Sequence, residues 1–92
     1  MIAEANVGAD GSFFGNLHGF SGCIWLGTGS YRLTLNDAPI DPNNITAQLS
    51  LVGAAGGQIS YSAGASTIDV FTFDANGIAA DKSFSIAVND LT

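Results

Sequence analysis

The sequence predicts an all-β protein: one antiparallel β-sandwich or jelly-roll-like domain over residues 1–92, with about seven or eight short strands. Three observations lead to this prediction. Apolar and polar residues alternate with a period of two through several runs. Clusters of Gly, Asn, Asp and Pro separate these runs at intervals of about ten residues. No segment has the length of a crossover helix, which a parallel sheet would need.

Residues 1–22 are expected to form an arm or an irregular segment that packs on the sheet or on a neighbouring subunit. Residues 2–7 alternate weakly and allow a short first strand. Residues 11–22 combine closely spaced glycines with aromatic side chains, and glycine weakens regular structure, so we expect a loop or a bulged strand there. The large side chains of this region would lie in the core or in a subunit contact. The candidate contact residues, for other subunits or a capsid, are Phe13, Phe14, Leu17, Phe20 and Trp25.

Two strand-like runs follow the arm. Residues 21–26 are apolar, which is typical of a strand that is buried on both faces or that ends against a partner. Gly27-Thr28-Gly29 predicts a turn rather than a phosphate-binding loop, because a strand pattern follows it and no Lys is placed as in a P-loop. Residues 31–36 alternate strictly, and this run predicts a strand whose core face carries Tyr31, Leu33 and Leu35.

The middle of the chain predicts a loop and two further strands. Residues 36–44 contain both prolines and several Asn and Asp residues, which favour turns. Residues 45–52 alternate again, and residues 53–57 are a glycine-rich, hairpin-type connection. Residues 59–63 alternate with Tyr61 on the core face.

The runs 68–73 and 83–88 also alternate, and we expect the rest of the chain to be organised around them. The connection between them begins Asp74-Ala75-Asn76-Gly77, the composition of a type I turn followed by a left-handed residue. The two runs therefore predict a hairpin. Across such a hairpin Asp69 and Lys82 would be close enough to form an ion pair.

Composition favours a folded oligomer. With 47% hydrophobic and 11% charged residues, the chain is far from a disordered composition. A chain of 92 residues buries only about two thirds of its unfolded surface. The part that stays exposed includes apolar surface, and this chain has few charged residues to cover it. We therefore expect a homo-oligomer in which other copies or a partner cover part of that surface.

Charge and cysteine content argue against several classes of partner and location. The net charge of -6, with only two Lys and Arg residues, argues against nucleic acid and anionic membranes. One cysteine, Cys23, cannot form an intrachain disulfide, and it is expected to be a buried small hydrophobe. No basic, apolar signal peptide and no apolar run of about 18 residues is present, so we expect the protein to stay where it is made or to assemble there.

Catalytic and cofactor chemistry is not expected, so we predict a protein that is not an enzyme and has no cofactor or metal. The only His is His18, in a glycine-rich segment, and a dyad of His18 with Cys23 is a minor alternative. Zinc would require more Cys and His ligands than the chain has. Calcium stays open at residues 37–44 and 74–81, whose Asp and Asn residues are also turn formers. Sugar stacking is a further alternative, on Trp25, Tyr31 and Tyr61.

Two motifs give the chain a resemblance to a known class of proteins. The first is Gly29-Ser30-Tyr31-Arg32-Leu33-Thr34-Leu35, a glycine turn followed by a strand. The second is residues 68–88, with the pattern V-x-T-F-D-x-x-G-x-x-x-D-x-x-F-x-I-x-V. Both resemble the small β-domains of tailed-bacteriophage virion proteins, which include fibre knobs and capsid decoration or cement proteins. The resemblance implies a jelly-roll or β-sandwich subunit, usually a homotrimer, that stabilises a shell or presents a receptor-binding surface.

No collagen-like or coiled-coil shaft precedes these motifs, which favours a capsid protein over a fibre. The expected function is therefore that of a non-enzymatic decoration protein that binds its own copies and the major capsid protein or another virion protein. The expected location is the virion, assembled in the host cytoplasm. The alternative is a receptor-binding or carbohydrate-binding knob, for which the partner would be a glycan.

Overall fold

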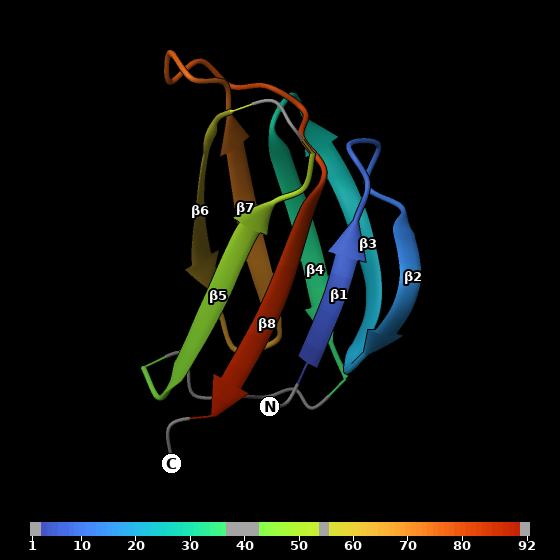
Figure 1. Ribbon diagram of the computed structural model, residues 1–92. Helices are drawn as coiled ribbons and strands as arrows, with labels where there is room; N and C mark the ends of the chain where they lie inside the picture. The colour runs from blue at the N-terminus through green and yellow to red at the C-terminus, as the bar shows by residue number, and fades with distance from the viewer. Residues whose placement is uncertain (1–2, 37–42, 54–55, 91–92) are drawn as a thin grey trace.

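The computed structural model describes residues 3–36, 43–53 and 56–90, and these residues form eight strands (Figure 1). The strands are β1 (Ala3–Val7), β2 (Phe13–His18), β3 (Phe20–Gly27), β4 (Ser30–Leu35), β5 (Ile45–Leu51), β6 (Gln58–Ala63), β7 (Thr67–Phe73) and β8 (Phe84–Asp90). Their number agrees with the seven or eight strands predicted from the alternating runs. The prolines of the predicted loop at 36–44 lie outside the described residues.

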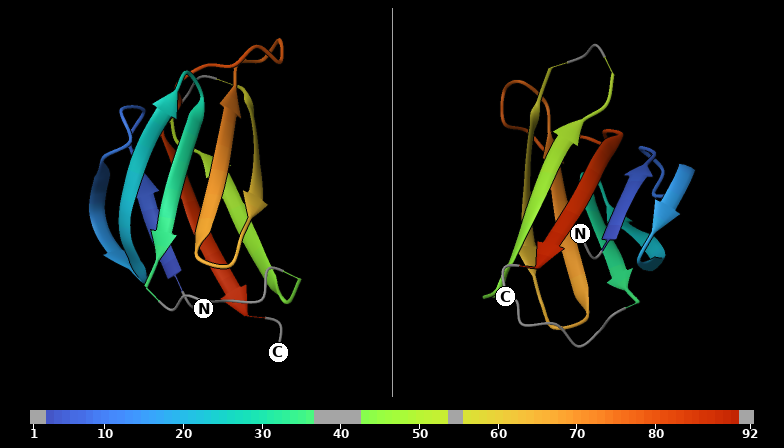
Figure 2. Two further views of the ribbon diagram at one scale, coloured as in Figure 1. Left: turned by 180° about the vertical axis from the view of Figure 1, so that it is seen from behind. Right: turned by 60° about the horizontal axis from the view of Figure 1, so that its bottom comes forward.

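The strands form two four-stranded sheets that pack face to face (Figure 2). Sheet A has the order β2-β1-β8-β5, and sheet B has the order β3-β4-β7-β6. All neighbouring strands are antiparallel. The predicted antiparallel β-sandwich is therefore confirmed, and each sheet buries one face against the other.

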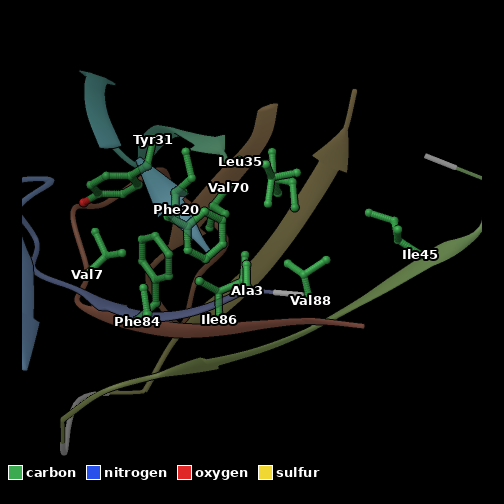
Figure 3. Close-up of a cluster of buried hydrophobic side chains, with 13 residues drawn as sticks. Ala3, Val7, Phe20, Tyr31, Leu35, Ile45, Val70, Phe84, Ile86 and Val88 are labelled. Atoms are coloured by element: carbon green, nitrogen blue, oxygen red, sulfur yellow. The ribbon is translucent and has the colours of Figure 1, made fainter. Parts of the chain in front are cut away.

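The core lies between the sheets, where alternate residues of both layers meet (Figure 3). The predicted core face of residues 31–36 is confirmed, since Tyr31, Leu33 and Leu35 are all buried. The Tyr31 ring packs edge to face on Phe84 of the opposite sheet, with 5.2 Å between ring centroids. The buried hydrophobic residues are Ala3, Ala5, Val7, Phe20, Tyr31, Leu33, Leu35, Ile45, Ile68, Val70, Phe84, Ile86 and Val88.

The hairpin predicted for residues 68–88 is wrong, because β7 and β8 belong to different sheets. β7 pairs with β4 and β6, whereas β8 pairs with β1 and β5. Residues 74–83 therefore cross from one layer to the other, and a connection of this length easily spans the separation of about 10 Å between packed sheets. The predicted Asp69–Lys82 pair does not form. Asp69 instead faces Arg32 on β4, with 2.9 Å between Arg32 Nε and Asp69 Oδ1.

The connection after β5 is also a crossing rather than a hairpin. β5 and β6 are edge strands of different sheets, and Ala54 and Ala55 between them lie outside the described residues. Tyr61 lies on the core face, opposite Val70, as predicted. It is nevertheless 37% exposed because β6 is an edge strand. Its hydroxyl accepts a hydrogen bond from the Ala47 backbone N at 3.4 Å, which joins the β5 and β6 edges.

Residues 11–22 follow the bulged-strand alternative and not the irregular loop, because they contain β2 and the start of β3. Glu4 pairs with His18, and Asn6 pairs with Phe14. The segment of β2 between its two partners is therefore longer than the matching segment of β1, and the extra residues form a bulge. Glycines within β2 and between β2 and β3 allow the backbone to bend there. Gly15 and Gly19 both have positive φ, at 69° and 81°, a conformation that costs other residues free energy.

Candidate functional site

Most of the exposed large hydrophobic side chains belong to two edge strands, β2 of sheet A and β3 of sheet B. Eight such residues are exposed in the described part of the chain: Phe14, Leu17, Ile24, Trp25, Leu26, Val52, Tyr61 and Ile78. Five of these eight belong to β2 or β3. We call four of them, Phe14, Leu17, Ile24 and Leu26, the apolar band; Trp25 is described separately below. The register places Phe14 on the outer face of sheet A and Ile24 on the outer face of sheet B, so the band includes residues of both sheets.

The exposure of Ile24 and Leu26 rules out the first of the two alternatives for residues 21–26, a strand buried on both faces. β3 is an edge strand, so only its inward face meets the core. Cys23 lies opposite Leu33 and packs against the core, whereas Ile24 lies opposite the exposed Arg32 and is itself 58% exposed. Burial raises the pKa of the half-buried Cys23 thiol to about 11.

The candidate contact residues separate into two groups. Phe14, Leu17 and Trp25 are exposed and available for contacts. Phe20 is only 3% exposed and belongs to the core, and the half-buried Phe13 stacks on it with 6.4 Å between ring centroids. Phe20 therefore follows the core alternative and not the contact alternative, because its side chain is already enclosed.

Ile24 and Leu26 are exposed residues that the sequence prediction did not include among the contacts. The sequence signal was present, because an apolar run as short as residues 21–26 fits an edge strand as well as a buried one. Only strand order distinguishes the two cases.

A second feature, the Trp25 pocket, lies at one end of the sandwich and is lined by residues of the β1–β2 turn, of β3 and of the 74–83 connection. It is a concavity of about 370 Å³, lined by Ala9, Asp10, Trp25 and Asp81. Ala9 and Asp10 come from the β1–β2 turn, Trp25 from the end of β3, and Asp81 from the 74–83 connection. Trp25 is 48% exposed. An exposed aromatic ring thus stands between two aspartates.

Asp81 holds this end of the sandwich together through its Oδ1 atom. Oδ1 accepts a hydrogen bond from the Gly29 backbone N at 2.7 Å and one from Trp25 Nε1 at 3.0 Å. The Gly29 N–H, and next the Trp25 N–H, hold the pKa of the Asp81 carboxyl below its usual range. The Tyr31 hydroxyl lies 3.5 Å from the same oxygen and donates to the Ala9 carbonyl at 2.7 Å. Asp81 therefore fixes the orientation of the indole ring.

Gly11 lets the β1–β2 turn lie directly on β3. Its φ of +89° is in the left-handed region, and an added Cβ would be 3.1 Å from Trp25 Cβ and 3.2 Å from Trp25 N. In the same turn Asp10 Oδ1 accepts hydrogen bonds from Ser12 Oγ at 2.6 Å and Ser12 N at 3.0 Å. These bonds, the hydroxyl first, lower the pKa of Asp10. Both aspartates of the Trp25 pocket are therefore ionised at neutral pH.

The outer face of sheet A carries a shallow polar concavity of about 460 Å³. Strand register places its side chains in two rows, Phe14–Asn6–Ser85–Ser50 and His18–Glu4–Ala87–Gln48. The small residues in the middle of the rows leave the hollow, and amide, hydroxyl and carboxylate groups line it. This surface supplies both hydrogen-bond donors and acceptors.

The minor catalytic and metal alternatives find no assembled site in the described residues. His18 is exposed at the end of β2, opposite Glu4, and is not among the residues that line the polar concavity. Cys23 packs against the core on another strand, so no dyad forms. No group of three or more His, Cys, Asp or Glu side chains in residues 3–36, 43–53 and 56–90 could hold a metal ion.

The calcium alternative can be followed only at residues 74–81. Asp74 Oδ1 accepts hydrogen bonds from the backbone N of Asn76 at 2.8 Å and of Ile78 at 3.1 Å, the usual role of Asp in a turn. Asp81 is engaged by Gly29 and Trp25, as described above. Most of the second candidate, residues 37–44, lies outside the described part of the chain.

The sugar-stacking set of Trp25, Tyr31 and Tyr61 does not form one face. Tyr31 is fully buried, and Tyr61 lies on β6 at the opposite edge of sheet B from Trp25.

In the described residues, no helix is long and apolar enough to cross a membrane. Comparison with known proteins gave no matching family model, and neither curated proteins nor solved structures matched the chain significantly.

Proposed function

We propose that the protein is a non-enzymatic structural subunit of a phage virion, a capsid decoration protein that binds the shell as a homo-oligomer. The observation that supports the proposal most is the apolar band on the two edge strands. Exposed aliphatic and aromatic side chains on adjacent edges are an unfavourable surface for an isolated chain, and contact with another protein removes them from water. The resemblance of residues 29–35 and 68–88 to phage β-domains supplies the virion context.

The edge position of β2 and β3 also provides a geometry for assembly. An edge strand presents backbone N–H and C=O groups with no partner strand, which can pair with a strand of another chain. In this protein the exposed apolar side chains accompany those edges. Copies or a capsid protein can therefore bind through backbone hydrogen bonds and apolar contact together.

The test compares the self-association of two double variants by sedimentation equilibrium. In the first, Ile24→Thr with Leu26→Thr, two exposed residues of the apolar band become polar while strand propensity is largely kept. We expect this variant to sediment as a monomer where the unchanged protein is an oligomer. The matched control, Val52→Thr with Ile78→Thr, changes two exposed apolar residues outside the band and should leave the oligomer intact. Equal behaviour of the two double variants would contradict the proposal.

Carbohydrate binding by a receptor-binding knob is the second candidate function, and the polar concavity on sheet A favours it. Its amide, hydroxyl and carboxylate groups match the donors and acceptors of a sugar, and Phe14 at the end of one row offers an apolar surface. A glycan array with the unchanged protein and an Asn6→Ala, Gln48→Ala variant tests this candidate. We expect the unchanged protein to bind a glycan and the Asn6→Ala, Gln48→Ala variant to lose that binding. Ser60→Ala, which changes a residue of sheet B, is the control and should keep it.

A further inference from the structure

We infer that the Trp25 pocket binds a guanidinium group, presented as an arginine side chain by a partner protein. The inference rests on the proposed function only in taking the partner to be a protein. It adds the chemistry of the contact, and it concerns a surface other than the apolar band. Three features of the pocket lead to it: the exposed Trp25 ring, the two carboxylates and the lack of free side-chain hydrogen-bond donors. The net charge of the chain is a fourth argument.

The ring is exposed and already oriented. Trp25 is 48% exposed, and its Nε1 donates to Asp81 Oδ1 at 3.0 Å, so the indole is held before any ligand arrives. A pre-oriented group loses less conformational entropy on binding. Among side chains, the planar guanidinium of arginine is the cation that stacks best on an indole face.

The two carboxylates each have one oxygen to spare. Asp10 and Asp81 use Oδ1 for their hydrogen bonds within the protein, and neither Oδ2 has a partner among the described residues. Both pKa values are lowered by those hydrogen bonds, so both groups carry charge at neutral pH. Ionised carboxylates beside an aromatic ring form the usual surroundings of a bound arginine.

The pocket has acceptors but no spare side-chain donor, and this decides between an arginine and a sugar. The side chains that line it are one alanine, two aspartates and a tryptophan whose N–H is already bound. A ligand must therefore supply the donors. Guanidinium has five N–H donors and no acceptor, so acceptors alone can satisfy it. A sugar hydroxyl could donate to the carboxylates, but its own oxygen would find no side-chain donor in the pocket.

The chain has little positive charge of its own to neutralise this pocket. Its only Lys and Arg residues are Arg32 and Lys82, against a net charge of -6. Arg32 is paired with Asp69 on sheet B. The Lys82 side chain lies beside Gly57, with Lys82 Cε 3.6 Å from the position of a Cβ added there. The cation is therefore expected from another protein, whose surface would be complementary in charge.

Trp25 fluorescence provides the test, because Trp25 is the only tryptophan in the sequence. The protein is titrated with N-acetyl-arginine amide and, at the same ionic strength, with N-acetyl-citrulline amide, N-acetyl-lysine amide and glucose. We expect a saturable change in emission with the arginine compound, weaker binding of the lysine compound, and no saturable change with citrulline, which has the same shape without the charge. A saturable change of equal affinity with citrulline or glucose would overturn the inference.

Asp10→Asn is the variant that tests the carboxylate, since the amide oxygen can still accept the Ser12 hydrogen bonds that shape the turn. Loss of one exposed ion pair should weaken binding of the arginine compound about fivefold. Asp74→Asn is the matched control, an aspartate with the same kind of turn bonds outside the pocket, and it should bind as the unchanged protein does. Near-unchanged binding by Asp10→Asn, with a native circular dichroism spectrum, would contradict the inference.

The outcome is separable from that of the proposed function. The Ile24→Thr, Leu26→Thr variant keeps the Trp25 pocket, so it should bind the arginine compound even as a monomer. Arginine binding without self-association would refute the oligomer alone, and self-association without arginine binding would refute the pocket alone.

Discussion

Among single residues, Asp81 is the one that joins three separate segments at this end of the protein through one oxygen atom. One carboxylate oxygen links the 74–83 connection to the β3–β4 turn and to the Trp25 ring. These partners lie 52 and 56 residues away in sequence. The sequence places Asp81 in a polar connection. It does not reveal this role, because a hydrogen bond between such distant residues depends on the order of the strands.

Asp81→Asn should change how stability depends on pH. The pKa of Asp81 is lowered in the folded protein, so its ionised form contributes stability that is present above the ordinary carboxyl pKa. That contribution is lost as pH falls through the lower, folded pKa. Urea unfolding measured from neutral pH to about pH 3 should therefore show a shallower loss of stability for Asp81→Asn than for the unchanged protein.

Some acid sensitivity should remain in Asp81→Asn, because the pKa of Asp10 is lowered in the same direction. The double variant Asp10→Asn, Asp81→Asn should be flatter still. Equal slopes for the single variant and the unchanged protein would show that the Gly29 and Trp25 hydrogen bonds do not stabilise the ionised carboxylate.

At the level of elements, the turn at Gly29 is where β3, β4, β7 and the following connection come together. Gly29 has a φ of +71°, and an added Cβ would overlap the carbonyl oxygen of Thr72 and lie 3.1 Å from Ala80 N. Gly29 O also accepts the Thr72 N–H at 2.8 Å. Only glycine fits between these backbones without displacing one of them.

Gly29→Ala should destabilise the protein by about 3 kcal/mol or more, from both backbone strain and overlap. Gly77→Ala is the matched control, since Gly77 has a similar φ of +81° but nothing within 4 Å of an added Cβ. It should lose only about 1 kcal/mol. Chemical denaturation gives both values, and equal losses at the two positions would show that the contact with Thr72 is unimportant.

The elements themselves were largely predictable, but their pairing was not. Period-two alternation located every strand after residue 30, and it identified Tyr31, Leu33 and Leu35 as core residues. Alternation is the same whether the next strand pairs with the previous one in a hairpin or lies in the opposite sheet. The prediction that β7 and β8 pair with each other is therefore wrong although both strands are correctly located. Residues 11–22 were ambiguous because glycine bends at Gly15 and Gly19 interrupt the alternation within and beside β2.

At the scale of the whole molecule, the sandwich encloses its core but leaves one side exposed. The core residues between the sheets are almost fully buried, whereas the apolar band lies in solvent at the β2 and β3 edges. Composition predicted this excess of apolar surface, and the fold shows where it lies. The location could not be predicted, because it depends on which strands are at the sheet edges.

The central claim is that this exposed side is an assembly surface, and the native mass of the unchanged protein tests it most directly. Sedimentation equilibrium over a range of micromolar concentrations should give an oligomer, expected to be a trimer with three times the 9.3 kDa mass of the chain. A particle of 9.3 kDa at every concentration, with the apolar band exposed and no self-association, would contradict the account.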